Sequence, residues 1–159
     1  MVPVRTRTRG PSRLREDGGQ AIVEFLIVVP ALLLLVVGLL EFGTAWRTSQ
    51  VVTNTAREGA RIAVLPPPQG TEANVLAAIE GRLASGGLNP ELAAIEILCD
   101  AGSGAACFGS GRAGAATDVQ IEYPYTFIFL GPVAGLWGGE GGDRFGTVTI
   151  RSNIVMRNE

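Results

Sequence analysis

The sequence contains no histidine and no lysine, and it has only two cysteines among its 159 residues. The absence of histidine removes the most common general base and metal ligand. Two cysteines cannot complete a four-ligand zinc site without further soft ligands. No serine stands in a nucleophile-elbow motif, and the acidic residues do not fall as a facing pair. We therefore expect a protein that is not an enzyme and that binds no metal and no other cofactor.

Long apolar runs are also scarce, because only one reaches the length that crosses a membrane. Residues 20–40 read QAIVEFLIVVPALLLLVVGLL. A hydrocarbon core of ~30 Å needs about 20 residues of α-helix at ~1.5 Å per residue. The rest of the chain is too small to surround a helix that is hydrophobic on every side. We expect one membrane-spanning helix, in contact with membrane lipid, and no polytopic membrane protein.

Positive charge is concentrated before this run. Residues 1–19 hold five arginines against Glu16 and Asp17, which gives net +3, and the remaining eight arginines and thirteen acids give net −5. Positively charged flanks stay in the cytoplasm. We therefore expect a single-pass protein of the cytoplasmic (inner) membrane, with a cytoplasmic N-terminus and an extracytoplasmic C-terminal domain. Topology explains these arginines better than nucleic-acid binding does, so we expect no nucleic-acid partner and no small-molecule substrate.

One acidic residue, Glu24, interrupts the apolar run. Inserting an acid at the centre of a spanning helix costs roughly 2.5–3.5 kcal/mol of free energy, and less near the interface. By default, such a residue is therefore taken to have a functional role. The simpler alternative is that Glu24 lies at headgroup depth and is solvated. Its neighbours are distinctive, because Gly18 and Gly19 end the basic leader and Phe25 follows Glu24 at once.

This arrangement, GQAIVEF at residues 19–25, resembles the processing site of type IV prepilins. The resemblance implies that a prepilin peptidase cuts after Gly19 and removes residues 1–19 as a leader. The free amine of Gln20 would then be a counter-charge for Glu24 of a neighbouring subunit within an apolar bundle. Many type IV pilins have phenylalanine as the first mature residue, whereas this chain has Gln20.

The apolar run is expected to continue as one long helix over residues 20–65. Apolar residues recur at three- or four-residue steps beyond residue 41, and three prolines at positions 66–68 end the pattern. Such a helix would be about 69 Å long, twice what a membrane needs. We expect residues 20–43 to span the membrane and residues 44–65 to project from it. Pro30 removes one backbone hydrogen bond and can kink the span.

Residues 66–159 are expected to form a small domain. Thr71 is a predicted N-cap for a short helix that stops at Gly86 and Gly87. Three runs typical of strands follow at residues 94–99, 117–125 and 146–157, whereas the glycine-rich residues 101–116 and 138–146 are expected to be loops. The predicted fold class is α+β, with an antiparallel sheet of about three strands and the short helix packed on the projecting half of the long helix.

The two cysteines, Cys99 and Cys107, fall in the part of the chain that we place outside the membrane, where disulfides persist. We expect them to be paired. Closing a loop of about nine residues stabilises the fold by about 2–3 kcal/mol on the chain-entropy model.

A charged cluster, Arg57, Glu58 and Arg61, lies on the projecting half of the long helix. Glu58 and Arg61 are three residues apart and can pair on a solvated face. Alternatively, these charges set the register of one subunit against another, as partner-facing charges do in coiled coils. Both interpretations remain open from the sequence.

The helix and its extension together resemble TadE-like proteins, which are minor pilins or pseudopilins of the tight-adherence (Flp) pilus. The residues that carry the resemblance are GQAIVEF at 19–25, the leucine-rich residues 30–40, EFGTAW at 41–46, NTAREGAR at 54–61 and the closing residues 155–159. The resemblance implies membrane insertion and a role in pilus assembly or secretion, with a prepilin peptidase, other pilin-like subunits and the Tad-type assembly machinery as partners. Phe25 and Pro30 become candidate subunit contacts, and no catalysis is implied.

Two alternatives to a pilin-like protein stay open. The chain could be a secreted binding module whose apolar run is a signal peptide cut near residues 43–45, although that run is long for a signal peptide, typically 7–15 residues, and contains Glu24. It could also be a membrane-anchored extracytoplasmic binding module in which Gly19 is not a cleavage site.

Overall fold

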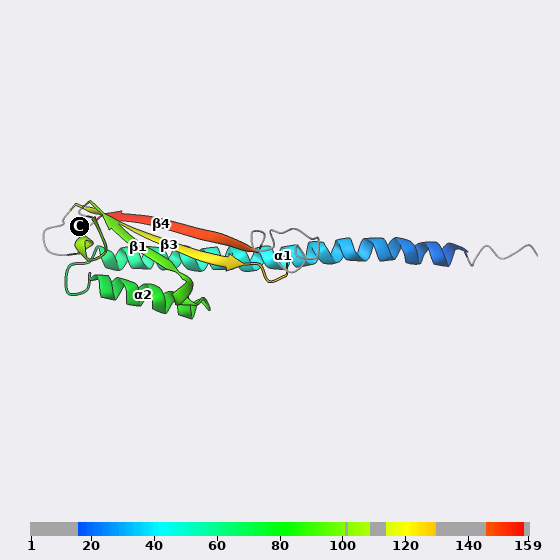
Figure 1. Ribbon diagram of the computed structural model, residues 1–159, viewed down its shortest axis with the longest axis horizontal. Coiled ribbons are helices and arrows are strands. Elements are labelled where there is room, and N and C mark those ends of the chain that lie inside the picture. Colours follow the sequence, from blue (N-terminus) through cyan, green and yellow to red (C-terminus); the bar gives the residue numbers. More distant parts are fainter. Residues whose placement is uncertain (1–15, 101, 109–113, 130–145, 158–159) are drawn as a thin grey trace, which may run out of the picture. The chain divides into compact units, whose positions relative to one another are not determined.

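The computed structural model describes residues 16–100, 102–108, 114–129 and 146–157. In chain order the elements are α1 (Glu16–Ala63), α2 (Glu72–Ser85), the 3-10 turn η2 (Pro90–Leu92), β1 (Ala94–Cys99), β2 (Gly102–Ser103), the 3-10 turn η3 (Gly104–Cys107), β3 (Ala116–Thr126) and β4 (Thr147–Arg157) (Figure 1). The chain divides into two compact units, Met1–Gly38 and Leu39–Glu159. The predicted α+β class, with a long apolar helix, a short helix and an antiparallel sheet, is confirmed.

Helix α1 is 48 residues long and runs without interruption through Pro30. It begins at Glu16, earlier than the predicted start near Gln20, and acidic residues such as Glu16 and Asp17 favour the first turn of a helix. The predicted leader, residues 1–19, otherwise lies outside the described residues. The helix ends at Ala63 rather than Leu65, and the Leu65 amide bonds to the Ile62 carbonyl in a tighter turn before the prolines.

The core of the second unit lies where one face of α1 meets α2 and the sheet. Each helix contributes apolar residues at four-residue steps, which places them on a single face. The fully buried members are Val52, Ala56 and Ala60 of α1, Val75, Ile79 and Leu83 of α2, and Val119 and Ile121 of β3. Figure 1 shows α2, β3 and β4 running alongside this half of α1.

The sheet has four antiparallel strands in the order β2-β1-β3-β4. In its register Val119 of β3 lies opposite both Ile97 of β1 and Ile154 of β4, so one face of the sheet is apolar. The sequence predicted about three strands, and β2 is the additional one. Its two residues pair only with the end of β1 and lie in a glycine-rich segment that was expected to be a loop, because two residues are too few to show an alternating pattern.

Local signals set the ends of α2. As predicted, Thr71 is its N-cap, and the Thr71 hydroxyl accepts a hydrogen bond of 3.3 Å from the Asn74 amide. At the other end the Gly86 amide donates to the Arg82 carbonyl, and Gly87 follows with a φ of +79°. Glycine adopts that left-handed conformation without steric cost, so the chain can turn back toward the sheet here.

A disulfide joins Cys99, at the end of β1, to Cys107, at the end of η3, with a Cα–Cα distance of 5.6 Å. Cys107 is 1% exposed and belongs to the core, which places the cross-link between the sheet edge and the interior. The bond therefore ties the turn after β1 to the rest of the second unit.

Gly59 allows α1 to approach both α2 and the sheet. A Cβ atom at this position would lie 2.8 Å from Ile79 Cδ1 of α2 and 3.5 Å from Val119 Cγ1 of β3. Gly81, on α2, has no atom within 4 Å of the corresponding point. Two helical glycines therefore differ only in whether a side chain has room.

We expect Gly59→Leu to lower the free energy of unfolding of the second unit by about 1–3 kcal/mol through overpacking. The control Gly81→Leu is expected to raise it by up to about 1 kcal/mol, because leucine is the better helix former. Pulse proteolysis of the full chain in detergent across a urea series measures both changes. Equal stabilisation by the two substitutions would contradict the close approach at Gly59.

Replacing both cysteines by alanine is expected to reduce the free energy of unfolding by about 2–3 kcal/mol, because the unfolded chain regains the freedom of the closed loop. The same proteolysis measures this loss. Before reduction, iodoacetamide should leave the mass of the natural protein unchanged. Alkylation of both thiols in unreduced protein would show that the pair is open.

Candidate functional site

The N-terminal half of α1 presents an apolar surface that the described chain leaves uncovered. One helical stretch, Gly19–Ala63, contains a window long and apolar enough to cross a membrane, and none of that window is buried. Most large apolar side chains between Ile22 and Leu40 are exposed, with exposed fractions from 43% to 71%. This surface is unfavourable in water, and it is of the kind that a bilayer or other apolar helices cover.

Glu24 lies on this surface, and the predicted pair Gln20 and Glu24 is brought together within one chain. The Gln20 side-chain amide donates a hydrogen bond of 3.0 Å to Glu24 Oε1, one helical turn away. A neutral amide offers no compensating charge. Glu24 therefore presents an exposed carboxylate that a cation outside the helix could still neutralise.

The predicted cleavage site, the bond after Gly19, lies inside the first turns of α1. Gly19 is exposed, and a Cβ atom there would meet nothing within 4 Å. Glycine weakens a helix by about 1 kcal/mol relative to alanine, and Gly18 and Gly19 stand together. This turn is therefore the easiest one of the helix to open for an incoming protein.

Phe25 and Pro30, the predicted subunit contacts of the apolar half, both point away from the described chain. Phe25 is 66% exposed, and Pro30 is exposed within an unbroken helix. A proline ring and an aromatic ring on an uncovered helix face are available to lipid or to a neighbouring helix.

The charged cluster on the second half of α1 contains one ion pair. Arg61 Nε lies 3.5 Å from Glu58 Oε2, with side-chain exposures of 71% and 28%. Arg57 is exposed on the same stretch of helix. An exposed pair of this kind contributes at most about 0.5 kcal/mol, so stability alone does not account for the cluster. Its role in subunit contacts stays a prediction.

The structure also shows a buried site that the sequence did not reveal, centred on Glu41. This carboxylate is 2% exposed, although it directly follows the apolar run. Its Oε1 accepts a hydrogen bond from the Ile128 amide at 2.6 Å, and its Oε2 accepts one from the Phe129 amide at 2.9 Å. The Tyr125 hydroxyl adds a longer contact to Oε1 at 3.4 Å.

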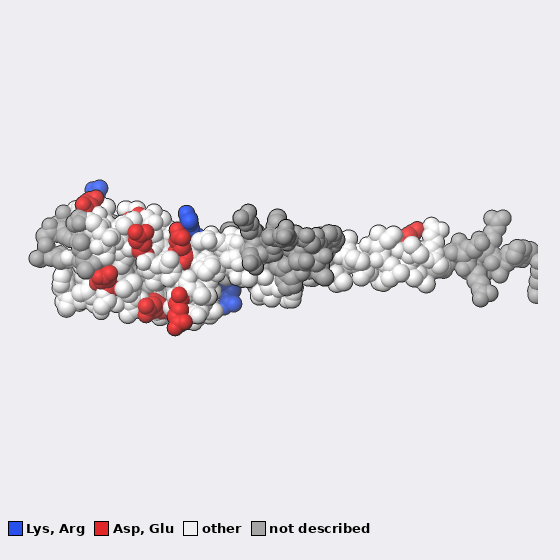
Figure 2. All heavy atoms as spheres, in the orientation of Figure 1, with Lys and Arg blue, Asp and Glu red and all other residues white. Residues whose placement is uncertain are grey.

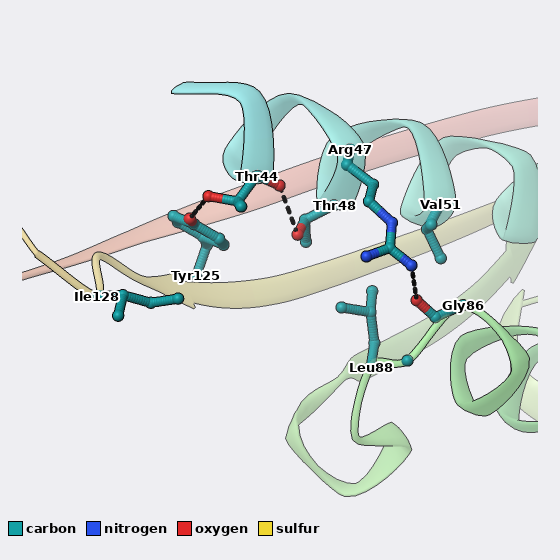
Figure 3. A pocket seen from close by; sticks show the side chains of 9 residues that line it. Thr44, Arg47, Thr48, Val51, Gly86, Leu88, Tyr125 and Ile128 are labelled. Atoms are coloured by element: carbon teal, nitrogen blue, oxygen red, sulfur yellow. Dashed lines mark hydrogen bonds between the residues drawn. The ribbon is translucent and has the colours of Figure 1, made fainter. Parts of the chain in front are cut away.

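A second contact extends this network along α1. The Tyr125 hydroxyl lies 2.6 Å from the Thr44 hydroxyl, and Figure 3 shows the two side chains meeting between α1 and the end of β3. Tyr125 is 8% exposed. The partners of Glu41 are 84 to 88 positions away in the chain, so no local pattern could have found them. The available signal was a lone carboxylate at the end of an apolar run.

A small hollow of about 190 Å³ lies next to this network, as Figure 3 shows. It is lined by Thr44, Arg47, Thr48, Val51, Gly86, Gly87, Leu88, Tyr125 and Ile128. Arg47 is the charged group among these lining residues, and its Nη2 already donates to the Gly86 carbonyl at 3.4 Å.

Acidic groups elsewhere on the second unit are dispersed. On the face shown in Figure 2, the visible acidic side chains lie over the sheet and α2. Within the part of the chain that the structure describes, no three potential metal ligands come together.

Comparison with known proteins locates the resemblance on α1. The family model described as TadE-like protein matches residues 19–61, which include Glu24, Glu41 and the charged cluster. No curated protein and no solved structure matches the chain. The predicted resemblance is confirmed over this stretch. Residues 19–61 are thus similar to TadE-like proteins, and they lie on a helix that is long and apolar enough to cross a membrane.

Proposed function

We propose that this chain is a non-enzymatic, membrane-anchored minor pilin or pseudopilin that takes part in assembly of, or secretion through, a tight-adherence pilus. The observation that carries the proposal is the TadE-like match at residues 19–61. The match includes residues from the exposed apolar half of α1 and from the half that contributes to the core. One helix can thus anchor a subunit in the membrane and hold its outer domain.

The proposed orientation follows from charge. The arginines that precede the apolar run stay in the cytoplasm, and the second unit, with its disulfide, lies outside the inner membrane. In this arrangement the bond after Gly19 faces the cytoplasmic side, where a prepilin peptidase would remove the leader.

Assembly is proposed to depend on Glu24. After cleavage Gln20 carries a free amine, and Glu24 of an adjacent subunit neutralises it when the apolar helices leave the bilayer and bundle together. The side chain of Glu24 is exposed, and its hydrogen bond within the described residues comes from the neutral amide of Gln20, which supports this role. The partners are other pilin-like subunits and the assembly machinery, and Arg57, Glu58 and Arg61 would contribute to register between subunits.

The fold argues against an ordinary signal peptide cut near residues 43–45. Such a cut would remove Glu41, whose carboxylate binds the amides of Ile128 and Phe129 in the second unit. Losing a buried acceptor leaves its donors unsatisfied, at a cost of about 1–3 kcal/mol for each group. This contact supports a helix that stays attached to the domain.

The mature N-terminus tests the processing step. In protein purified from its own host's membranes, mass spectrometry of the N-terminal peptide should find Gln20 as the first residue. A first residue near Trp46 would mean a secreted domain, and an intact N-terminal leader would mean an uncut anchor. Either finding would contradict the proposal.

Substitution of Glu24 tests the assembly step. Glu24→Ala should leave membrane insertion unchanged but reduce co-purification with pilin-like subunits by at least about tenfold, because breaking a charge pair in an apolar bundle leaves the partner charge uncompensated. Glu80→Ala, on the exposed face of α2, removes the same charge as a control and should have no effect. Equal recovery of subunits with both variants would show that Glu24 is not a counter-charge.

A further inference from the structure

The second unit exposes large apolar side chains on both sides of the buried Glu41. Two groups come from different parts of the chain, one from α1 and one from the segment after β3. They are Leu39 (65% exposed), Leu40 (59%), Phe42 (67%) and Trp46 (59%) on α1, and Ile128 (61%) and Phe129 (50%) after β3. The rings of Phe42 and Trp46 stack with centroids 6.2 Å apart. We call these six residues the apolar collar.

Glu41 joins the two halves of the collar. Its two carboxylate oxygens bind the successive amides of Ile128 and Phe129, so the backbone of that segment is attached to a turn of α1. Bonds of an amide to a carboxylate are charge-assisted and are about twice as strong as neutral ones. The backbone N–H groups of Ile128 and Phe129 thus have a partner inside the protein, whereas the side chains of both residues remain exposed.

The position of the collar along α1 indicates what covers it. Residues 25–40 carry no charged or hydrogen-bonding side chain and span about 24 Å as a helix, which is close to the thickness of a hydrocarbon core. Glu41 is the first polar residue after them. In the sequence, the α1 part of the collar therefore lies at the C-terminal end of this apolar run.

The residue types of the collar fit the water interface of a bilayer. Tryptophan side chains such as that of Trp46 accumulate at headgroup depth, and the Phe42 ring stacks on Trp46. A backbone amide that is buried away from water needs a hydrogen-bond partner. Glu41 supplies that partner for Ile128 and Phe129.

We propose that the apolar collar is a second membrane contact, in which Glu41 holds Ile128 and Phe129 against the bilayer surface beside the point where α1 leaves it. The occupant is lipid, and the contact limits how the outer domain can tilt on its helix. This inference rests on the part of the proposed function that places α1 in a bilayer, and it adds a lipid-binding role for Ile128 and Phe129.

Site-specific probes test the contact in nanodiscs that hold one full chain each. The substitution Ile128→Cys, labelled with the fluorophore NBD, reports on the collar, and Val155→Cys, which is equally exposed at 61%, is the matched control. Leu33→Cys reports on the span. The paired native cysteines do not react without reductant. The quenchers are spin-labelled lipid chains and aqueous iodide.

Lipid quenching should be severalfold stronger at positions 33 and 128 than at 155, and iodide quenching should show the reverse order. Quenching at 33 together with iodide access at 128 equal to that at 155 would overturn the inference while leaving the spanning helix intact. An unquenched position 33 would instead contradict the proposed membrane span. Protection of position 128 only in discs that hold two chains would overturn the inference in favour of a second copy as the occupant.

Glu41→Gln tests the attachment itself. It leaves a single acceptor for two amides, so lipid quenching at position 128 should fall severalfold while quenching at 33 is unchanged. Glu80→Gln is the control and should change neither position. Unchanged quenching at 128 in the Glu41 variant would overturn the assignment of Glu41 as the residue that holds the collar.

Discussion

The uncovered apolar surface on the first half of α1 is the constraint on which the rest of the structure depends. Each exposed Leu, Ile, Val or Phe side chain gains about 1.5–3 kcal/mol when it is buried, and this half of the helix carries many of them with no cover from the described chain. A bilayer can supply that cover before assembly, and neighbouring helices can supply it afterwards. The apolar face of the second half of the same helix is covered by the protein itself, because its alanines pack against α2 and the sheet.

The two acids at the ends of the apolar stretch are satisfied in opposite ways. Glu41 is buried, and its carboxylate is occupied by two backbone amides and a tyrosine hydroxyl from the same chain. Glu24 is exposed and has an amide of the same helix as its partner. Glu41 thus serves the fold of one subunit, whereas Glu24 retains capacity for a charge on another. This difference connects the geometry of α1 to a proposed cycle of membrane storage and assembly.

Sequence patterns predicted the parts of the fold that depend on local periodicity. The alternation in β3 and β4, the Thr71 cap and the long apolar helix are all found. The start of α1 at Glu16 was missed because two glycines suggested a break that the helix tolerates, and β2 was missed because a two-residue strand has no period. The Glu41 site was out of reach, since its partners are backbone amides, which carry no sequence signature. The family match covers residues 19–61 of α1, including the four collar residues there, and does not extend to the sheet or to Ile128 and Phe129.

Extraction of host membranes with alkaline carbonate tests the central claim most directly, because it removes peripheral proteins and leaves integral ones in the bilayer. If the apolar half of α1 is covered by lipid, the full-length protein should remain in the membrane pellet, together with its disulfide-linked domain. Release of the chain into the carbonate supernatant would show that the bilayer does not cover α1 and would contradict the account.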